Sequence, residues 1–210
     1  MERPHVKHVI DCPKAHYPGH LVLASSSKRR QRLMEQAGYD FEVRTPRLGE
    51  DKLHPRDPRV LAESLAYAKA RQVADESIGD FVIGADTIVV VDEEVIGKPA
   101  DEADAREILS RLSGTTHEVI TGLCVLNPQR GDRLIGADVT RIKMRKITPA
   151  ELDEYLAGGE GLGKAGAYAI QQNGDRFIEE IEGSFSNVVG LPMCLLAGYL
   201  DVMKDLFDRK

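Results

Sequence analysis

The chain has 210 residues, of which 30% are charged, and a formal net charge of -6. This length allows a hydrophobic core in one domain or two lobes, and the negative balance argues against non-specific nucleic-acid binding. No apolar run is long enough to span a bilayer, and the start lacks a signal-peptide pattern. Cys12, Cys124 and Cys194 are odd in number and far apart, so we expect no disulfide framework and a cytoplasmic, reducing location.

Residues 1–20 are expected to form an extension in front of the first strand, and residues 21–208 a single domain. The extension holds thiol and imidazole groups, which are zinc ligands. These residues are His5, His8, Cys12, His16 and His20. Because their spacing matches no standard zinc finger, a solvated polar arm is favoured over a metal site.

Predicted strands and helices alternate along the rest of the chain. Strands are expected at 21–24, 41–45, 117–126, 138–147, 167–170 and 177–181. Helices are expected at 28–37, 59–75, 102–112 and 193–207, with a further helix starting at Pro149 behind an N-cap Thr148. The apolar run 81–91 predicts two buried strands interrupted in the middle, and a turn at 92–94 predicts a hairpin. The pattern indicates a mixed α/β fold, a twisted sheet in two lobes around a central cleft.

Three cations, Lys28–Arg30, lie in the first turn of the first predicted helix, directly after the serines Ser25–Ser27. Helix N-termini carry partial positive charge, so cations are unfavourable there unless an anion is bound. Free N–H groups, hydroxyls and arginine forks together suit a polyphosphate. The alternative is that the cations point into water while a serine caps the helix, and charge alone leaves both open.

Asp86 interrupts an apolar, β-branched run that should be buried. An isolated buried carboxylate is costly, so this residue needs donors, a metal or a cleft, and a functional role is favoured over a structural turn. Lys98 ends the following hairpin, in the sequence "GKP".

The stretch "GGEGLGKAG" has the glycine and lysine spacing of a P-loop, from Gly158 to Lys164. Ala165 stands where a P-loop has Ser or Thr, and the stretch follows a predicted helix instead of a strand. We therefore reject a P-loop and expect the glycines to end the helix.

Six motifs occur in order: "LASSSKRRQRLMEQAGYDFEV", "AYAKA", "GADTIVVVDEEVIGKP", "LSGTTHEVITG", "KAGAYAIQ" and "GSFSNVVGLP". Together they resemble the Maf family of nucleoside triphosphate pyrophosphatases, from about Leu21 to Leu200. The resemblance implies hydrolysis between the α- and β-phosphates of a nucleoside triphosphate. It also implies a divalent metal cofactor, Mg or Mn, a homodimer, and a fold shared with inosine-triphosphate pyrophosphatases.

The resemblance also implies roles for individual residues. The catalytic group would be Asp86, as proton acceptor, with Lys69, Lys98 and Glu50. The metal would be held by Glu50 and Asp86. Phosphate and base would be bound by Ser25, Ser27, Arg29, Arg30, Thr87 and Gln171. Two positions depart from the family pattern: Lys28 replaces a loop proline, and Gly49 replaces an acid before Glu50.

The motifs "GADT" and "KAGAYAIQ" are similar to the subfamily that acts on dTTP and UTP. The sister subfamily, which prefers 7-methyl-GTP, has a serine before the aspartate and a glutamine after it. A further alternative is a nucleotide-binding regulator of septum formation, to which the family is also linked. Retention of Asp86, Lys69 and Lys98 favours the enzyme, because a pure binding protein would not need the acid and both lysines.

Overall fold

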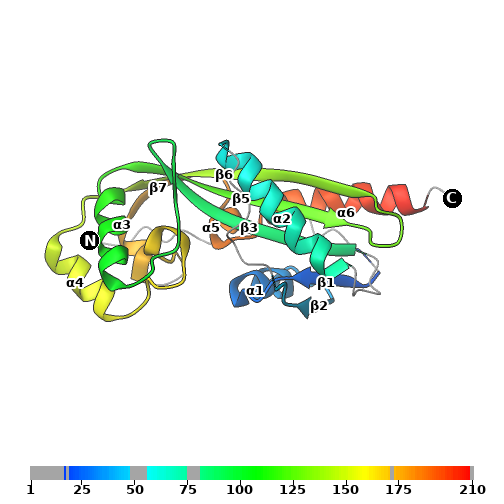
Figure 1. The fold of residues 1–210 in the computed structure, drawn as a ribbon, viewed down its shortest axis with the longest axis horizontal. Helices are drawn as coiled ribbons and strands as arrows, with labels where there is room; N and C mark the ends of the chain where they lie inside the picture. Colours follow the sequence, from blue (N-terminus) through cyan, green and yellow to red (C-terminus); the bar gives the residue numbers. More distant parts are fainter. Residues whose placement is uncertain (1–16, 18, 48–55, 75–80, 171–172, 209–210) are drawn as a thin grey trace.

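A seven-stranded mixed sheet forms the centre of the molecule, and the computed structural model describes residues 17, 19–47, 56–74, 81–170 and 173–208 (Figure 1). Its strands are β1 Leu21–Ala24, β2 Phe41–Arg44, β3 Phe81–Val91, β4 Glu94–Ile96, β5 Thr116–Leu126, β6 Arg133–Met144 and β7 Ile178–Glu182. The order is β2-β1-β3-β5-β6-β7, and β4 pairs with β3. β1 runs parallel to β2 and β3, whereas the other pairs are antiparallel. The predicted mixed α/β class is confirmed.

Helices cover both faces and both ends of this sheet. They are α1 Lys28–Gln36, α2 Pro58–Ala74, α3 Glu102–Leu112, α4 Pro149–Ala157, α5 Phe185–Val189 and α6 Met193–Asp208, with 3₁₀ helices η2 Ala165–Ala167 and η3 Asn173–Phe177. Alternate residues of one strand face opposite sides. Val82 packs in the cluster that contains α2, and its neighbour Ile83 packs in the cluster that contains α6. The two helices therefore lie on opposite faces of the sheet.

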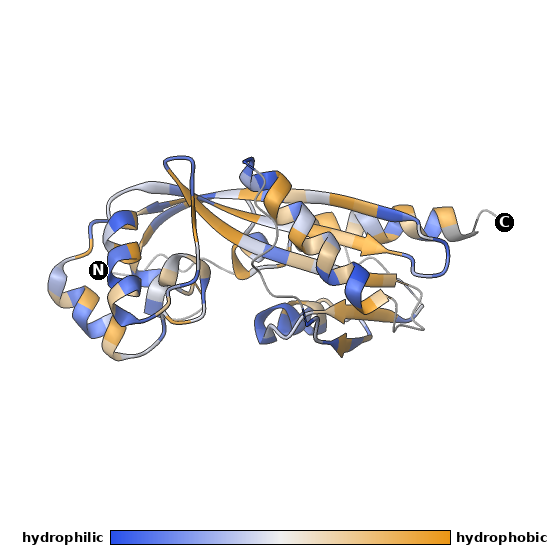
Figure 2. Ribbon diagram, viewed as in Figure 1, coloured by the Kyte–Doolittle hydropathy of each residue, from blue (hydrophilic) through white to orange (hydrophobic). Residues whose placement is uncertain are grey.

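The long strands β3, β5 and β6 run through both ends of the elongated molecule (Figure 1). At one end, β1, β2, α1 and α6 form what we call the α1 lobe, and at the other, β4, α3, α4 and η2 form the α3 lobe. Each lobe has its own buried apolar cluster. Figure 2 shows the central strands as largely hydrophobic, the outer strands with hydrophilic segments, and the helices as mixed, as expected when each helix buries one face.

Helix α2 packs unusually close to the sheet. Its buried stripe is Ala62, Ala66 and Ala70, which lie four residues apart on one face. Below them, the strands carry Gly84 and Gly122, where an added Cβ would overlap the helix backbone. The larger side chains Leu61 and Leu65 are only partly buried, and the small residues allow the closer approach.

Most of the predicted elements are confirmed to within a few residues, but three are wrong. Residues 81–91 form one unbroken strand, because Asp86 keeps its place in the ladder opposite Gly122. Residues 167–170 are not a strand, since positive φ at Gly166 and Ala167 breaks the extended path. Strand β6 begins at Arg133, earlier than expected, and ends before the predicted 147.

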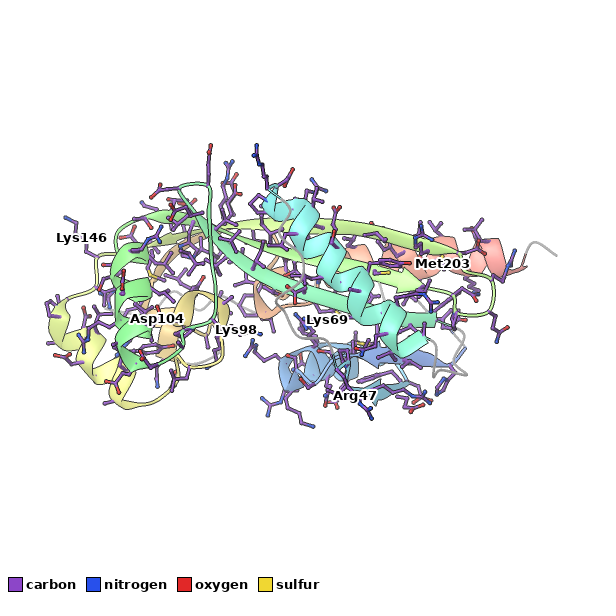
Figure 3. All side chains as sticks on the ribbon, viewed as in Figure 1. Arg47, Lys69, Lys98, Asp104, Lys146 and Met203 are labelled. Atoms are coloured by element: carbon purple, nitrogen blue, oxygen red, sulfur yellow. The ribbon has the colours of Figure 1, made fainter. Side chains whose placement is uncertain are left out.

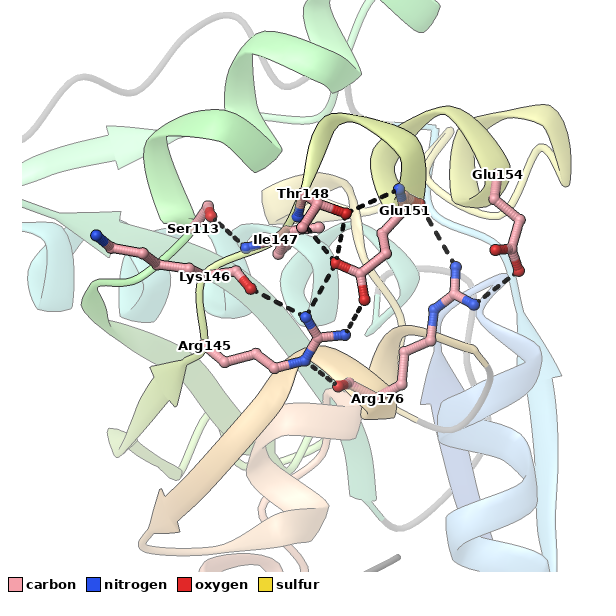
Figure 4. A network of polar contacts seen from close by, with 8 residues as sticks. All are labelled: Ser113, Arg145, Lys146, Ile147, Thr148, Glu151, Glu154 and Arg176. Carbon is pink, nitrogen blue, oxygen red and sulfur yellow. Dashed lines mark hydrogen bonds and ion pairs between the residues drawn. The ribbon is translucent and has the colours of Figure 1, made fainter. Parts of the chain in front are cut away.

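The capping box that the sequence predicts at the start of α4 is present and forms part of a larger network (Figure 4). Glu151 accepts hydrogen bonds from the Thr148 backbone N–H at 2.9 Å and from the Arg145 fork at 2.7 and 3.1 Å. These bonds lower the pKa of Glu151 to about 2, with Arg145 the largest cause. The Arg145 Nε also donates to the Arg176 carbonyl at 2.9 Å, so the network ties α4 to η3.

The cysteines differ from the expectation. Cys194 in α6 is disulfide-bonded, whereas Cys124 is a buried free thiol. The expected lack of disulfides is therefore wrong and gives no support to a reducing location. In the part of the chain that the structure describes, no helix is long and apolar enough to cross a membrane.

Candidate active site

A cavity of about 420 Å³ lies between the two lobes. The α1 lobe contributes the segment from Ala24 to Arg30, and the α3 lobe contributes Lys98 and the segment from Gly163 to Ala165. Figure 3 shows Lys69 on α2 and Lys98 after β4 on either side of this region. Cavities of this size accommodate small-molecule ligands. Of the predicted residues, the cavity brings together Ser25, Ser27, Arg29, Arg30, Lys69, Asp86, Thr87 and Lys98.

The turn between β1 and α1 is arranged to leave helix N–H groups open. Ser25 is buried, and its Oγ accepts from the Ser27 N–H at 3.2 Å and from Arg30 Nη1 at 3.1 Å. Ser27 is the N-cap residue of α1, but its side chain makes no capping hydrogen bond, and the first turn has no acid. Helix α1 begins at Lys28 without the family's proline. The turn thus has the features of an anion-binding helix start.

Arg30 is held by groups from three elements. Its Nε donates to the Gly190 carbonyl at 2.6 Å, and its Nη2 donates to Thr87 Oγ1 at 3.2 Å. The neighbouring Arg29 donates from Nε to the Val189 carbonyl at 3.4 Å. Both guanidinium groups therefore rest on carbonyls at the end of α5, where cations are favourable.

Asp86 forms an ion pair with Lys69 across the seam between β3 and α2. The Asp86 residue is 8% exposed and Lys69 is partly buried, so the pair is shielded from bulk water. The pair depends on the glycine positions of the sheet, because they let α2 come close enough for Lys69 to reach the strand. Pairing with an ammonium is what allows a carboxylate to stay at a buried position.

Positive charge dominates the cavity. Among the described residues that line it, six are cationic and Asp86 is the carboxylate. The cations are Lys28, Arg29, Arg30, Lys69, Lys98 and Lys164. Burial lowers the pKa of Arg29, and burial lowers that of Arg30 despite the attraction of Asp86. Burial and then Arg29 lower the pKa of Lys164. Bringing these cations together and partly burying them costs free energy, and a bound polyanion would offset that cost.

Comparison with known proteins decides the family, since the family described as "Maf-like protein" matches residues 20–203. The chain belongs to the Maf family. Three curated Maf relatives carry the name dTTP/UTP pyrophosphatase. The protein from Citrifermentans bemidjiense is 42% identical over 87% of this chain and 95% of its own length. Those from Geotalea uraniireducens and Geobacter sulfurreducens are 45% and 43% identical, over 83% and 90% of this chain and 90% and 95% of their own lengths.

One solved structure is more distant from this Maf protein. It is a nucleoside-triphosphatase, also named dITP/XTP pyrophosphatase, from Mycobacterium abscessus. It is 13% identical, with a TM-score of 0.38, and the match covers 67% of this chain and 94% of the solved chain. This likeness is too slight to carry an argument, so the shared fold that the sequence resemblance implies stays a prediction.

The divalent metal expected of a Maf protein can be compared with the groups in the cavity. Within the described ranges, no cluster of three or more His, Cys, Asp or Glu side chains could hold a metal ion. Mg²⁺ needs no such cluster, because it is commonly held by one or two carboxylates together with substrate phosphates. Asp86, in the same cavity as the uncapped start of α1, fits that requirement.

Two predicted site residues, Glu50 and Gln171, lie outside the described residues. The cavity also includes two residues that sequence reasoning missed, Lys164 and Tyr168. Lys164 belongs to the stretch that was rejected as a P-loop, and its Nζ donates to the Glu160 carbonyl. Its place after a glycine-rich turn in the "KAGAYAIQ" motif was a signal that it faces the site.

Tyr168 connects the cavity to a buried histidine. Its hydroxyl is 2.8 Å from Nε2 of His117, which is 1% exposed. Burial lowers the pKa of His117 to about 4, so the imidazole is neutral at neutral pH. In an unfolded chain a histidine has a pKa of about 6.5, so the unfolded state binds a proton that the folded state does not. Stability is therefore lost as the pH falls from about 6.5 to 4.

We expect His117→Gln, which keeps a polar group but cannot titrate, to reduce this pH dependence. Between pH 7 and pH 5 the wild type should lose about 2 kcal/mol more of unfolding free energy than the variant. Urea denaturation at both pH values measures the difference. His20→Gln, at an exposed histidine, is the control and should behave as the wild type. Equal losses in the wild type and His117→Gln would show that His117 does not set the acid sensitivity.

Proposed function

We propose that this protein hydrolyses dTTP and UTP to the nucleoside monophosphate and pyrophosphate. The observation that carries the proposal is the cationic cavity around the Asp86–Lys69 pair, beside a helix start with open N–H groups. A triphosphate supplies several negative charges, and its α-phosphorus needs a nearby proton acceptor for an attacking water. The relatives named dTTP/UTP pyrophosphatase, whose similarity covers most of this chain, support the same activity.

In the proposed reaction, a water oxygen forms a bond to the α-phosphorus, and the bond from that phosphorus to the bridging oxygen breaks. Pyrophosphate leaves with the electron pair, and Asp86 accepts the proton of the water. Arg30, Lys69 and Lys98 neutralise phosphate oxygens, which lowers the repulsion between the substrate and the attacking water. Arg30 and Lys69 are partly buried, so their charges act more strongly on a bound phosphate than they would in bulk water.

Two further site groups are proposed from the family resemblance. Glu50 is a second catalytic carboxylate and, with Asp86, would hold Mg²⁺ or Mn²⁺. Such an ion supplies Lewis-acid polarisation of a phosphoryl oxygen. Lys69 keeps the Asp86 carboxylate in its buried position until the substrate and the ion are bound.

Recognition of the base is proposed to involve Gln171, Arg29 and Thr87. The hydrogen bonds that Thr87 already makes limit those that it can form with a base. Thr121 uses its one hydroxyl proton toward the Asn187 carbonyl, so Thr87 must donate to Thr121 at 2.9 Å. Since Thr87 also accepts from Arg30, it offers a base one acceptor lone pair and no donor. That acceptor suits the ring N–H of thymine or uracil.

The proposal predicts a ranking of substrates. With Mg²⁺ present, kcat/KM for dTTP and UTP should exceed that for ATP, GTP and 7-methyl-GTP by about tenfold or more, because a wrong base leaves buried polar groups unpaired. Pyrophosphate release across this panel measures the ranking. Thr87→Gln should erode the preference, and the control Thr87→Ser, which keeps the hydroxyl, should retain it. A preference for 7-methyl-GTP would overturn the subfamily, and no pyrophosphate from any triphosphate would overturn the activity.

The homodimer that the resemblance implies and the cytoplasmic location expected from the sequence stay predictions, as does the division into a 1–20 extension and a 21–208 catalytic domain. The proposed small-molecule partner is a nucleoside triphosphate, and no binding of nucleic acid or membrane is proposed.

A further inference from the structure

A buried polar network lies directly behind the cavity. Thr121 and Asn187 are both 0% exposed, and neither is among the residues that line the cavity. Buried hydroxyl and amide groups reduce stability unless they are hydrogen-bonded, so an apolar pair would serve a purely structural role as well. Because Thr121 and Asn187 lie between the site and the core, we expect the reason that these two residues are polar to involve the site.

The hydrogen bonds of this network run in one direction from the arginine. Arg30 Nη2 donates to Thr87 Oγ1 at 3.2 Å, Thr87 donates to Thr121 Oγ1 at 2.9 Å, and Thr121 donates to the Asn187 carbonyl at 2.9 Å. Each hydroxyl has a single proton, which is spent on the next member. Thr87 and Thr121 are opposite each other on β3 and β5, so the sheet register fixes the position of the hydrogen bond between them.

Asn187 also fixes the second support of the arginine. Its Nδ2 donates to the Val119 carbonyl and to Thr140 Oγ1, both at 2.9 Å, which anchors α5 on β5 and β6. Three residues further on, the Gly190 carbonyl accepts from Arg30 Nε at 2.6 Å. Asn187 therefore fixes the distance of α5 from the sheet. This distance in turn fixes the position of the Gly190 carbonyl that accepts from Arg30.

We propose that Thr121 and Asn187 are positioning residues that orient Arg30 toward the phosphates of the substrate, an inference that rests on the proposed function. Three of the five N–H donors of Arg30 bond to Gly190, Ser25 and Thr87. These three bonds fix the plane of the guanidinium group, and the remaining donors serve an anion in the cavity. Freeing one edge lets the group rotate and weakens phosphate binding without removing the charge.

The test uses tripolyphosphate, which has the charges of the substrate but no base and no nucleoside. Isothermal titration measures its Kd for the full chain, with Mg²⁺ present. Thr121→Val removes the hydroxyl that accepts from Thr87, so the Thr87 oxygen is no longer held in place for Arg30, and this Kd should rise about tenfold. Thr121→Ser keeps the hydroxyl and should restore the wild-type Kd. Thr115→Val, a matched change of a hydroxyl that bonds to the Leu112 carbonyl in the α3 lobe, should leave Kd unchanged.

A double-mutant cycle with Arg30→Ala shows whether the effect passes through the arginine. If it does, Thr121→Val adds nothing to the Kd of Arg30→Ala, whereas additive effects would overturn the proposal. If Thr121→Val does not fold, Thr87→Val breaks the same series of hydrogen bonds at a half-buried position. Its Kd for tripolyphosphate is then measured in the same way. A lower melting temperature with an unchanged Kd would show that the network is structural alone.

The activity assay separates this inference from the proposed function. If pyrophosphate release is also measured, Thr121→Val should raise KM for dTTP about tenfold with a smaller change in kcat. A wild type that binds tripolyphosphate but cleaves no triphosphate would overturn the proposed function while the titrations still decide the role of Thr121.

Discussion

Asp86→Asn is expected to lower the rate of pyrophosphate release by about 10²–10⁴-fold, the usual contribution of a general base. The amide is nearly the same size as the carboxylate but cannot accept the proton of the attacking water. Asp86 is 8% exposed, and among the described residues that line the cavity it alone carries a carboxylate, so no lining neighbour can replace it. Release is measured with saturating dTTP.

The control for this variant is Asp138→Asn. Asp138 lies on β6, is part-buried like many strand residues, and accepts from the Val139 N–H at 2.9 Å, but it does not line the cavity. It should keep wild-type turnover. Circular dichroism and the melting temperature establish that both variants are folded. A folded Asp86→Asn protein with turnover near that of the wild type would refute the role of Asp86 as proton acceptor.

Lys69→Met is expected to destabilise the protein by about 3 kcal/mol and to remove most of the activity. Breaking a buried ion pair costs about 3–5 kcal/mol, because the remaining charge keeps its desolvation penalty without a partner. The lower end of that range applies here, since Arg30 also attracts Asp86. Methionine matches the apolar stem of lysine and lacks only the ammonium group, so α2 should pack on the sheet as before. Urea denaturation measures the unfolding free energy.

The double variant Lys69→Met/Asp86→Asn separates stability from catalysis. With both charges gone, the unfolding free energy should return to within about 1 kcal/mol of the wild type, because replacing both members of a buried pair is often close to neutral. Turnover should stay absent. A double variant no more stable than Lys69→Met alone would mean that the loss of unfolding free energy comes from packing of the helix and not from the unpaired Asp86 carboxylate.

Much of the fold could be predicted because local signals are strong. Thr148, Pro149 and Glu151 specify the start of α4 by themselves, and the structure has that capping box. The unbroken β3 could not be predicted, because a carboxylate in an apolar run is tolerated only through Lys69, which comes from another element. Likewise, the close approach of α2 depends on glycines in two strands that the helix sequence does not reveal.

The candidate site could be predicted in part for the same reason. Motifs pointed to Asp86, Arg30 and Thr87, and the structure brings them to one cavity. Thr121 and Asn187 were missed, since each is an ordinary polar residue until its partners are known. The 2.9 Å bond between them joins residues 66 positions apart, and no local pattern indicates such a pairing.

The glycine–alanine seam between α2 and the sheet has a consequence for how this protein can change. The reach of Lys69 toward Asp86 depends on Gly84 and Gly122, which do not line the cavity. A single methyl group at either glycine would force the helix outward and carry the ammonium away from the carboxylate. The spacing of the two charged groups is therefore encoded in residues that have no functional group at all, and drift at those positions is constrained by chemistry that takes place elsewhere.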